Sequence, residues 1–228
     1  MSADLKNFTP RPRPPREPME GRFVRLEPLD PARHGDDLYA ASTVSDVEQR
    51  FAGLYDYPPK TREEFDAWLA NAARSEDPMH FAVIDKKSGK VGGRQTFMRI
   101  DEKNGVIEIG NIYWGPLISR TPVTTEALYL FARRVFDDLG YRRFEWKCNN
   151  TNVASKRAAE RFGFVFEGIF RQHLIVKGKN RDTAWFSMLD SEWPRNRKAF
   201  EGWLDPANFD SEGRQKRRLE EIRADIAG

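Results

Sequence analysis

The pattern of apolar and polar positions predicts several strands in the first half of the chain. In the stretches 21–29 (GRFVRLEPL) and 106–115 (VIEIGNIYWG), apolar side chains alternate with other residues at the period of two that is typical of a strand. An apolar run at 81–84 and a further strand at 91–100 flank a Lys-Ser-Gly turn, which is a hairpin signal. Because only the turn 101–105 separates the last two strands, we expect three consecutive antiparallel neighbours.

Capping residues and a helical period predict helices between and after these strands. Asp30 and the proline after it start one helix, and Thr61 with Glu64 forms the capping box of a second. A third helix follows the loop 116–125 and is closed by Gly140. Its apolar face consists of Leu128, Phe131, Ala132, Val135, Phe136 and Leu139.

The second half of the chain alternates strand and helix before a second hairpin. A strand at 142–149 (RRFEWKCN) is followed by a short helix at 152–163. Strands at 164–177 and 181–189 form the hairpin, and helices follow, the last of them a charged helix from Arg214. This order of elements predicts an α/β fold with a mixed sheet covered by helices on both faces.

Composition narrows the function classes. The chain has 228 residues with 39% hydrophobic and 32% charged residues, and it contains no apolar run long enough for a transmembrane helix or a signal peptide. Its single cysteine cannot form an internal disulfide, so we expect a soluble cytoplasmic protein. The net charge of +3 is spread over interspersed acids and bases, which argues against nucleic acid as the primary ligand. No cluster of His, Cys and acidic residues has metal-ligand spacing.

A series of short motifs runs along the middle of the chain. They are Glu108-Ile-Gly110, Thr125-Glu-Ala127, Leu139-Gly-Tyr-Arg142, Asn152-x-x-Ser155, Gly163-Phe164, Glu167-Gly168-x-x-Arg171, Arg181-Asp182, Phe186-Ser187-Met188 and Glu192-Trp193. In this order and spacing the chain resembles the GNAT superfamily of acyl-CoA-dependent N-acetyltransferases, and within it the ribosomal-protein acetyltransferase branch of the RimJ/RimL type.

The resemblance implies a domain organisation and a fold. It covers residues 21–193, which we expect to form one acetyltransferase domain between a proline-rich arm (1–20) and a helical C-terminal extension (194–228). The family's sheet is mixed and mostly antiparallel. Its central strand, here 106–115, splays away from its neighbour after a bulge, and the pantetheine arm of acetyl-CoA pairs with the exposed edge. The implied contacts come from the backbone of Ile112, Tyr113 and Trp114, where an N–H would also hold the thioester oxygen.

The pyrophosphate of the coenzyme needs donors at the start of the following helix. The family has a glycine-rich loop there, whereas this chain has Arg120-Thr121-Pro122-Val123-Thr124-Thr125, in which the proline lacks an N–H. The Arg120 guanidinium and the threonine hydroxyls can compensate. Beyond the strand, the implied coenzyme-binding residues are Arg120, Thr121, Val123, Thr124, Thr125, Asn152 and Ser155.

Catalysis requires a neutral amine, a base and a donor for the departing sulfur. Many family members have a tyrosine that acts as the general acid on the short helix before the Gly-Phe pair, whereas this chain has Ala159 at that position. The resemblance then makes Ser155 the candidate that hydrogen-bonds the sulfur, unless it only bonds the helix backbone. The candidate bases are, in order, Glu108 on the central strand, His173 after Gly163, and Glu145; each could instead be structural.

The leading hypothesis is direct transfer of an acetyl group from acetyl-CoA to a primary amine in a ternary complex, without a metal. The acceptor remains open between a protein N-terminus and a small molecule such as an amino acid, a polyamine or an aminoglycoside. The missing glycines and tyrosine keep a second class open, a catalytically weak acyl-CoA-binding module that senses the coenzyme or docks a partner. We expect a monomer or a homodimer.

Overall fold

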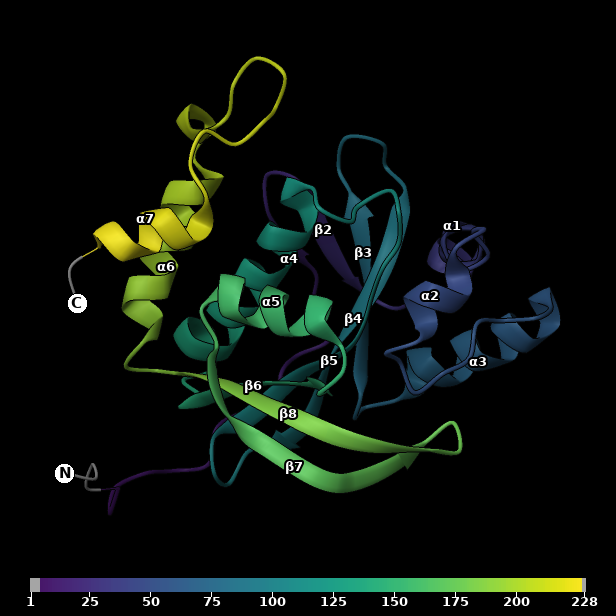
Figure 1. The fold of residues 1–228 in the computed structure, drawn as a ribbon, viewed down its shortest axis with the longest axis horizontal. Helices are drawn as coiled ribbons and strands as arrows, with labels where there is room; N and C mark the ends of the chain where they lie inside the picture. The colour runs from purple at the N-terminus through teal and green to yellow at the C-terminus, as the bar shows by residue number, and fades with distance from the viewer. Residues whose placement is uncertain (1–4, 227–228) are drawn as a thin grey trace.

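The computed structural model describes residues 5–226 and contains one mixed sheet with helices on both faces (Figure 1). The strand order across the sheet is β1-β2-β3-β4-β5-β6-β8-β7, and every neighbouring pair is antiparallel except the parallel pair β5–β6. The predicted fold class is therefore confirmed. The strands are β1 (Met19–Glu20), β2 (Val24–Pro28), β3 (Met79–Asp85), β4 (Val91–Asp101), β5 (Val106–Trp114), β6 (Arg143–Asn149), β7 (Val165–Val176) and β8 (Lys179–Leu189).

Two apolar clusters hold the helices against the sheet. The larger one packs α4, α5 and α6 on one face, and the smaller one packs α1 and α3 on the other (Figure 1). The helices are α1 (Pro31–Ala41), α2 (Val47–Phe51), α3 (Arg62–Arg74), α4 (Pro122–Arg133) with a π-helical turn at Arg134–Asp138, α5 (Val153–Phe162), α6 (Trp193–Leu204), a 3₁₀ turn at Pro206–Asn208, and α7 (Leu219–Asp225). None of the helices in residues 5–226 is long and apolar enough to cross a membrane.

The predicted helix starts are confirmed, with one exception near the C-terminus. The Asp30 carboxylate accepts from the backbone N–H of Ala32, and the Thr61 hydroxyl accepts from that of Glu64, as capping residues do. The last helix begins at Leu219 and not at Arg214, because the Asp210 carboxylate accepts from backbone N–H groups of the segment 212–214 and holds it in a turn.

The terminal segments take part in the main fold. Residues 19–20 of the predicted arm pair with β2 as an edge strand. A proline-rich segment is tolerated at a sheet edge because an edge strand forms backbone hydrogen bonds on one side only. Upstream, the Arg11 backbone N–H donates to the Glu102 carbonyl at 2.9 Å. In the C-terminal extension, Phe200 and Trp203 of α6 are buried in the larger cluster. Residues 1–4 of the arm and 227–228 of the extension lie outside the described residues.

The expected splay of the central strands begins at a bulge in β5. Thr96 of β4 pairs with Gly110, but Arg94 pairs with Tyr113, so β5 carries an extra residue there, and Asn111 adopts a positive φ of 47°. The parallel pairing of β5 with β6 ends at Ile109, although both strands continue. Beyond that point the two strands separate, and the edge of β5 that faces β6 has no strand partner in the described chain.

A buried carboxylate joins α4 to the beginning of β2. Glu126 accepts hydrogen bonds from the backbone N–H groups of Arg22, Phe23 and Val24, at 2.8, 2.6 and 2.8 Å. A Cβ atom at Gly21 would lie 2.3 Å from the Glu126 side chain, so only glycine leaves room for this contact. The carboxylate thereby fixes the helix whose first turn borders the opening between β5 and β6.

We predict that Glu126→Gln lowers the free energy of unfolding by about 2 kcal/mol, because an amide oxygen replaces a charged acceptor and its NH₂ group meets the N–H donors. Denaturant titration followed by circular dichroism measures this change. Glu63→Gln on exposed α3 is the matched control and should stay within about 0.5 kcal/mol of the parent protein. Equal unfolding midpoints for the two variants would contradict the anchoring role of Glu126.

Candidate active site

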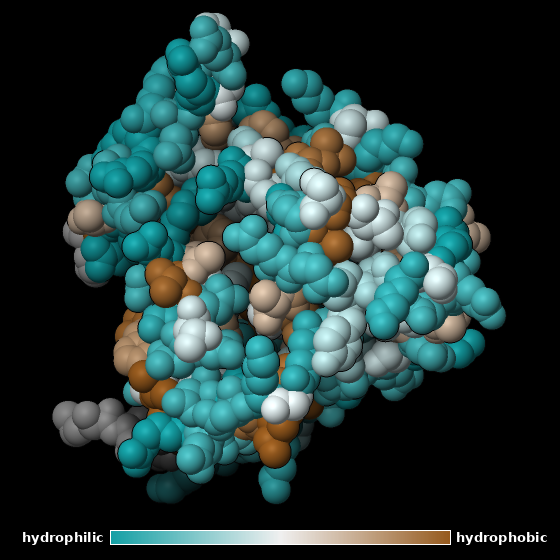
Figure 2. Space-filling view, turned by 45° about the vertical axis from the view of Figure 1, so that its right-hand side comes forward, coloured by the Kyte–Doolittle hydropathy of each residue, from teal (hydrophilic) through white to brown (hydrophobic). Residues whose placement is uncertain are grey.

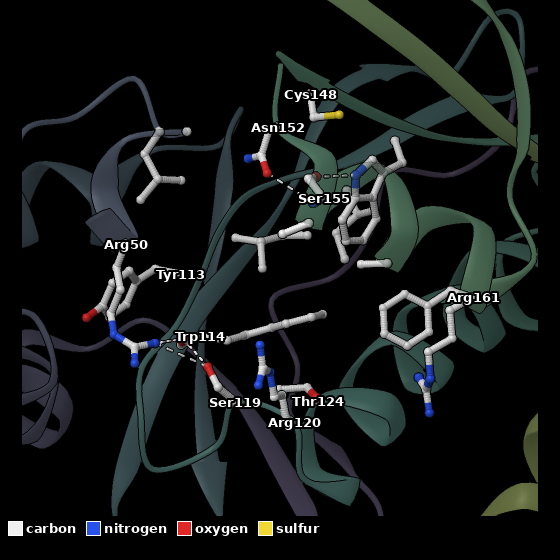
Figure 3. A pocket seen from close by; sticks show the side chains of 18 of the residues that line it. Arg50, Tyr113, Trp114, Ser119, Arg120, Thr124, Cys148, Asn152, Ser155 and Arg161 are labelled. Atoms are coloured by element: carbon white, nitrogen blue, oxygen red, sulfur yellow. Dashed lines mark hydrogen bonds between the residues drawn. The ribbon is translucent and has the colours of Figure 1, made fainter. Parts of the chain in front are cut away.

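A cleft of about 1480 Å³ lies where β5 and β6 separate. Its walls come from the ends of these two strands, the first turns of α4 and α5, and α2 with the loop after it (Figure 3). The space-filling view shows a hollow in the surface on this side of the molecule, bordered by both hydrophobic and hydrophilic residues (Figure 2). Among residues 5–226, no group of three or more His, Cys, Asp or Glu side chains is placed to hold a metal ion.

The start of α4 forms one end of the cleft and differs in detail from the expectation. The Thr121 hydroxyl donates to the Ile118 carbonyl at 2.7 Å, and the Thr124 hydroxyl donates to the Thr121 carbonyl at 3.2 Å. These two hydrogens are therefore already used inside the protein. The Thr121 oxygen also accepts from the Val123 N–H at 3.3 Å, as a helix cap. Of the expected hydroxyl donors, only that of Thr125 is free of such a bond to a carbonyl.

Two arginines bring positive charge to this end. Arg120 is exposed, adopts a positive φ of 60° and has no hydrogen-bond or ion-pair partner within residues 5–226. Arg161 reaches over from α5, where its Nη1 donates to the Thr125 hydroxyl at 3.1 Å and its guanidinium packs on the rings of Phe162 and Trp203 (Figure 3). Burial lowers the pKa of Arg161. An anion at the helix start would face both side chains.

Sequence reasoning missed Arg161. Arg157 stands one helical turn earlier on α5, yet it is exposed while Arg161 is half-buried. The difference arises because Trp203, which covers Arg161, comes from α6 far along the chain. Arg50 on α2 was missed for the same reason: its Nη1 lies 3.4 Å from the Ser119 hydroxyl and 3.5 Å from the Trp114 carbonyl, both distant in sequence (Figure 3).

Ser155 lies in the middle of the cleft with a defined orientation. The Trp146 indole N–H donates to its oxygen at 3.0 Å, and the Asn152 side-chain oxygen accepts from its backbone N–H at 3.0 Å (Figure 3). Because an indole is only a donor, the Ser155 oxygen is the acceptor, and its own hydrogen remains for another group. That group is either the neighbouring Cys148 sulfur or a ligand in the cleft.

Of the expected strand residues, Ile112 and Trp114 line the cleft and Tyr113 anchors it. The Tyr113 ring is buried against Phe51 and its hydroxyl donates to the Ala41 carbonyl. The Trp114 indole donates to the Gln95 side chain at 3.2 Å, and its ring meets that of Trp146 across the opening. The side chains thus hold the strand in place and leave its main chain to face the cleft.

Glu108 is the one candidate base that borders the cleft. Its carboxylate is 3% exposed, and its Oε2 pairs with Arg99 at 2.7 Å and with Lys147 at 2.9 Å. A Cβ atom added at Gly110 would lie 2.2 Å from the Met98 sulfur and 3.4 Å from Oε1, so Met98 and the carboxylate pack closely against this glycine. Both ion pairs of Glu108 are made by Oε2, so Oε1 is the oxygen that we assign to proton transfer in the proposal below.

The other two candidate bases lie away from the cleft lining. Glu145 is held between Lys147 and Arg143, at 2.7 Å from each, in a chain of ion pairs that continues to Glu167. The Arg143 guanidinium holds the pKa of the Glu167 carboxyl below its ordinary value. His173 shares a hydrogen bond of 3.0 Å with the Thr183 hydroxyl. The structure thus brings Glu108 and Ser155 to one cleft and leaves Glu145 and His173 outside it.

Comparison with known proteins identifies the family. A family model described as an acetyltransferase (GNAT) domain matches residues 24–165. A solved GCN5-related N-acetyltransferase from Brucella melitensis is 65% identical, with a TM-score of 0.95 over 96% of this chain and 100% of that one. This chain therefore belongs to the GNAT acetyltransferase family, as its motifs predict.

Curated relatives are more distant. The uncharacterized N-acetyltransferase p20 of Bacillus licheniformis is 30% identical over 117 residues, which are 50% of this chain and 63% of p20. YdaF of Bacillus subtilis, provisionally named a ribosomal N-acetyltransferase, is 29% identical over 106 residues, or 46% of this chain and 57% of YdaF. The matches thus span less than two thirds of the length of either relative.

We predict slow alkylation of Cys148 in the folded protein. Burial raises the pKa of its thiol, and the thiolate is the reactive form. At pH 8 the iodoacetamide rate should be at least about 100-fold lower in buffer than in 8 M urea, where the thiol regains an ordinary pKa. Because Cys148 is the only cysteine, intact-mass spectrometry reports one site, with glutathione as the internal reference. Similar rates in both conditions would show that the thiol is accessible.

Proposed function

We propose that this protein transfers an acetyl group from acetyl-CoA directly to a primary amine, with both substrates bound in the cleft. The observation that carries the proposal is the separation of β5 from β6 after Ile109, which leaves main-chain groups of β5 without a strand partner beside a cleft. A pantetheine arm carries amide groups that can complete this open edge. Ile112, Tyr113 and Trp114 supply the main-chain contacts in this proposal.

The pyrophosphate would lie at the start of α4. The helix dipole favours an anion there, although the Thr121 N–H already bonds the Ile118 carbonyl and the Val123 N–H already bonds the Thr121 hydroxyl. Because Pro122 has no N–H and two threonine hydroxyls are already used, Arg120 and Arg161 would supply the additional donors. Val123 and Asn152 complete the border of the coenzyme in this proposal; the Val123 N–H and the Asn152 side-chain oxygen take part in the caps of α4 and α5.

The proposed reaction is a single displacement at the thioester. The lone pair of a neutral amine attacks the carbonyl carbon, a C–N bond forms, and a main-chain N–H of β5 holds the oxyanion. The C–S bond then breaks, and the Ser155 hydroxyl hydrogen-bonds the departing sulfur. The proton lost by the nitrogen passes through water to Glu108 Oε1 and finally to the thiolate, so that the products are an amide and coenzyme A.

Within the family we propose the RimJ/RimL-like, ribosomal-protein acetyltransferase branch, which the name of YdaF and the order of the motifs support. The acceptor in this proposal is a small-molecule amine or a protein N-terminus. The second candidate is an acyl-CoA-binding module with weak turnover. It is favoured by Ala159 at the position of the usual tyrosine and by the proline in the α4 turn.

A first experiment tests binding and turnover together. Coenzyme A at about 100 times its Kd should stabilise the protein by about 2.7 kcal/mol, which raises the Tm by roughly 5–10 °C for a chain of this size. Acetyl-CoA with an accepted amine should release free thiol and yield the acetylated amine by mass spectrometry. Coenzyme binding without thiol release over a broad amine panel would leave only the binding module. No thermal shift would exclude both.

Arg161→Gln sharpens this test. We expect it to weaken coenzyme A binding about tenfold, because one charge-assisted contact to a phosphate is lost. The matched control is Arg157→Gln, which removes an exposed arginine one turn away on the same helix and should leave the Kd unchanged. Isothermal titration calorimetry gives both values. Equal Kd values for the two variants would remove Arg161 from the proposed site.

Substitutions at the cleft test the catalytic roles. Glu108→Gln should lower kcat about 100-fold by removing the base, and Ser155→Ala about tenfold by removing one hydrogen bond to the sulfur. Both should retain the thermal shift with coenzyme A. Glu145→Gln removes a neighbouring carboxylate of the same ion chain, and His173→Gln removes the histidine outside the cleft; both should keep kcat. Full activity of Glu108→Gln would refute its role as the base.

A further inference from the structure

Arg181 of β8 is a buried cation without an anion. Its side chain belongs to a residue that is only 5% exposed, and it borders the cleft. Within residues 5–226 it makes no hydrogen bond and no ion pair, and its Nε is buried without a partner. Its sequence neighbour Asp182 is half-buried and accepts from the Gln172 backbone N–H and from the Asn180 side chain. Because an unpaired buried charge is costly, this arrangement points to an anion that is supplied from outside the chain.

The other charges at this end of the cleft are already balanced. Glu108 and Glu145 are paired with Arg99 and Lys147, as described above. The two aspartates near the cleft are also occupied: Asp46 pairs with Arg50 at 2.9 Å and Asp56 with Arg94 at 2.7 Å. Among residues 5–226, no carboxylate forms an ion pair with Arg181, so its charge has no direct counterion.

Arg181 borders the part of the cleft that lies between β8 and the loop after α2. Its guanidinium carbon is 4.8 Å from the centre of the Tyr55 ring, in the loop after α2. Although burial opposes it, Glu108 and Tyr55 raise the pKa of Arg99, which pairs with Glu108 at 2.7 Å. Tyr55 is thus a neighbour of both Arg181 and the Arg99–Glu108 pair, and Tyr55, Glu108 and Arg181 line the same cleft.

The hairpin that carries Arg181 is fastened over this end of the cleft. Lys177, at the tip, donates to the Phe51 carbonyl at 2.9 Å and lies over the Tyr57 ring. These contacts join the β7–β8 hairpin to α2 and its loop. Arg181 and Tyr55 are thus held together before any ligand arrives, which lowers the entropic cost of binding.

We infer that Arg181 binds the carboxylate of the acceptor, and that the acceptor is a small amino acid whose amine then lies near Glu108. This inference rests on the proposed function. The guanidinium presents one face to Tyr55, which leaves its N–H edge for the planar, two-oxygen geometry of a carboxylate. The carboxylate supplies the missing negative charge. In this inference the amine, which is only a few bonds from the carboxylate in the same molecule, is directed toward Glu108.

Matched acceptors test the inference. Thiol release from acetyl-CoA is measured with L-amino acids, their carboxamides and the corresponding decarboxylated amines. We expect kcat/KM for the best free acid to exceed that for its carboxamide about 100-fold, because the carboxamide leaves the arginine unpaired. The amine of a carboxamide loses its proton more readily, so amine reactivity alone would give the opposite order.

Variants locate the effect at Arg181. Arg181→Gln should lower kcat/KM for the free acid about 100-fold and leave the carboxamide unchanged, and Arg181→Lys should restore part of the loss. Arg171→Gln, which removes an exposed arginine of the same hairpin, should change neither substrate. Equal rates for acids and carboxamides, or an equal loss for both in Arg181→Gln, would overturn the inference. The inference would also be overturned if peptides with amidated C-termini were acetylated efficiently and Arg181→Gln did not change that rate.

Thermal denaturation supplies a readout that does not depend on turnover. Without ligand, the Tm of Arg181→Gln should equal or exceed that of the parent, since the uncompensated charge is gone. The preferred free acid should raise the Tm of the parent only, whereas coenzyme A should raise both equally. If Arg181→Gln instead loses the shift with coenzyme A, the arginine serves the coenzyme and the inference fails. If coenzyme A shifts neither protein and no amine releases thiol, the proposed function itself fails.

Discussion

The extra residue in β5 is the constraint on which the rest of the cleft depends. It turns the strand away from β6 after Ile109, and it is held from behind by a buried cation. Arg94 donates to the Asn111 carbonyl at 3.3 Å, pairs with Asp56 and lies over the Trp68 ring. A bulge supported in this way is a fixed part of the backbone, so the open strand edge exists before any ligand binds.

The polar face of the sheet is organised by one chain of ion pairs. Arg99, Glu108, Lys147, Glu145, Arg143 and Glu167 alternate in charge across four strands. Buried pairs of this kind add little net stability compared with apolar packing, but removal of one member leaves a charge without a partner. Their effect here is geometric. They fix the position of the Glu108 carboxylate, because both of its ion pairs are made by Oε2.

Local signals in the sequence predicted most of the fold. The caps at Asp30 and Thr61 and the period of two in β5 depend on neighbouring residues, and a sequence contains that information directly. The site was predicted less completely. Glu108 and Ser155 line the cleft, and their catalytic roles stay predictions. The burial of Arg161 depends on Trp203, and the isolation of Arg181 depends on which carboxylates are already paired. Such facts are properties of the packed chain and have no local pattern.

In the two proposals, the two parts of the cleft bind anions by different physical means. At α4, partial charges of helix amides act together with arginines near the surface, and this arrangement suits a multiply charged group that remains partly hydrated. At β8, a single guanidinium is removed from water before a ligand arrives, and such a site rejects a neutral analogue because its charge would remain unpaired. The segments that form the second end, α2 with its loop and the β7–β8 hairpin, are separate from α4. The choice of acceptor can therefore change without altering the part of the fold that faces the coenzyme.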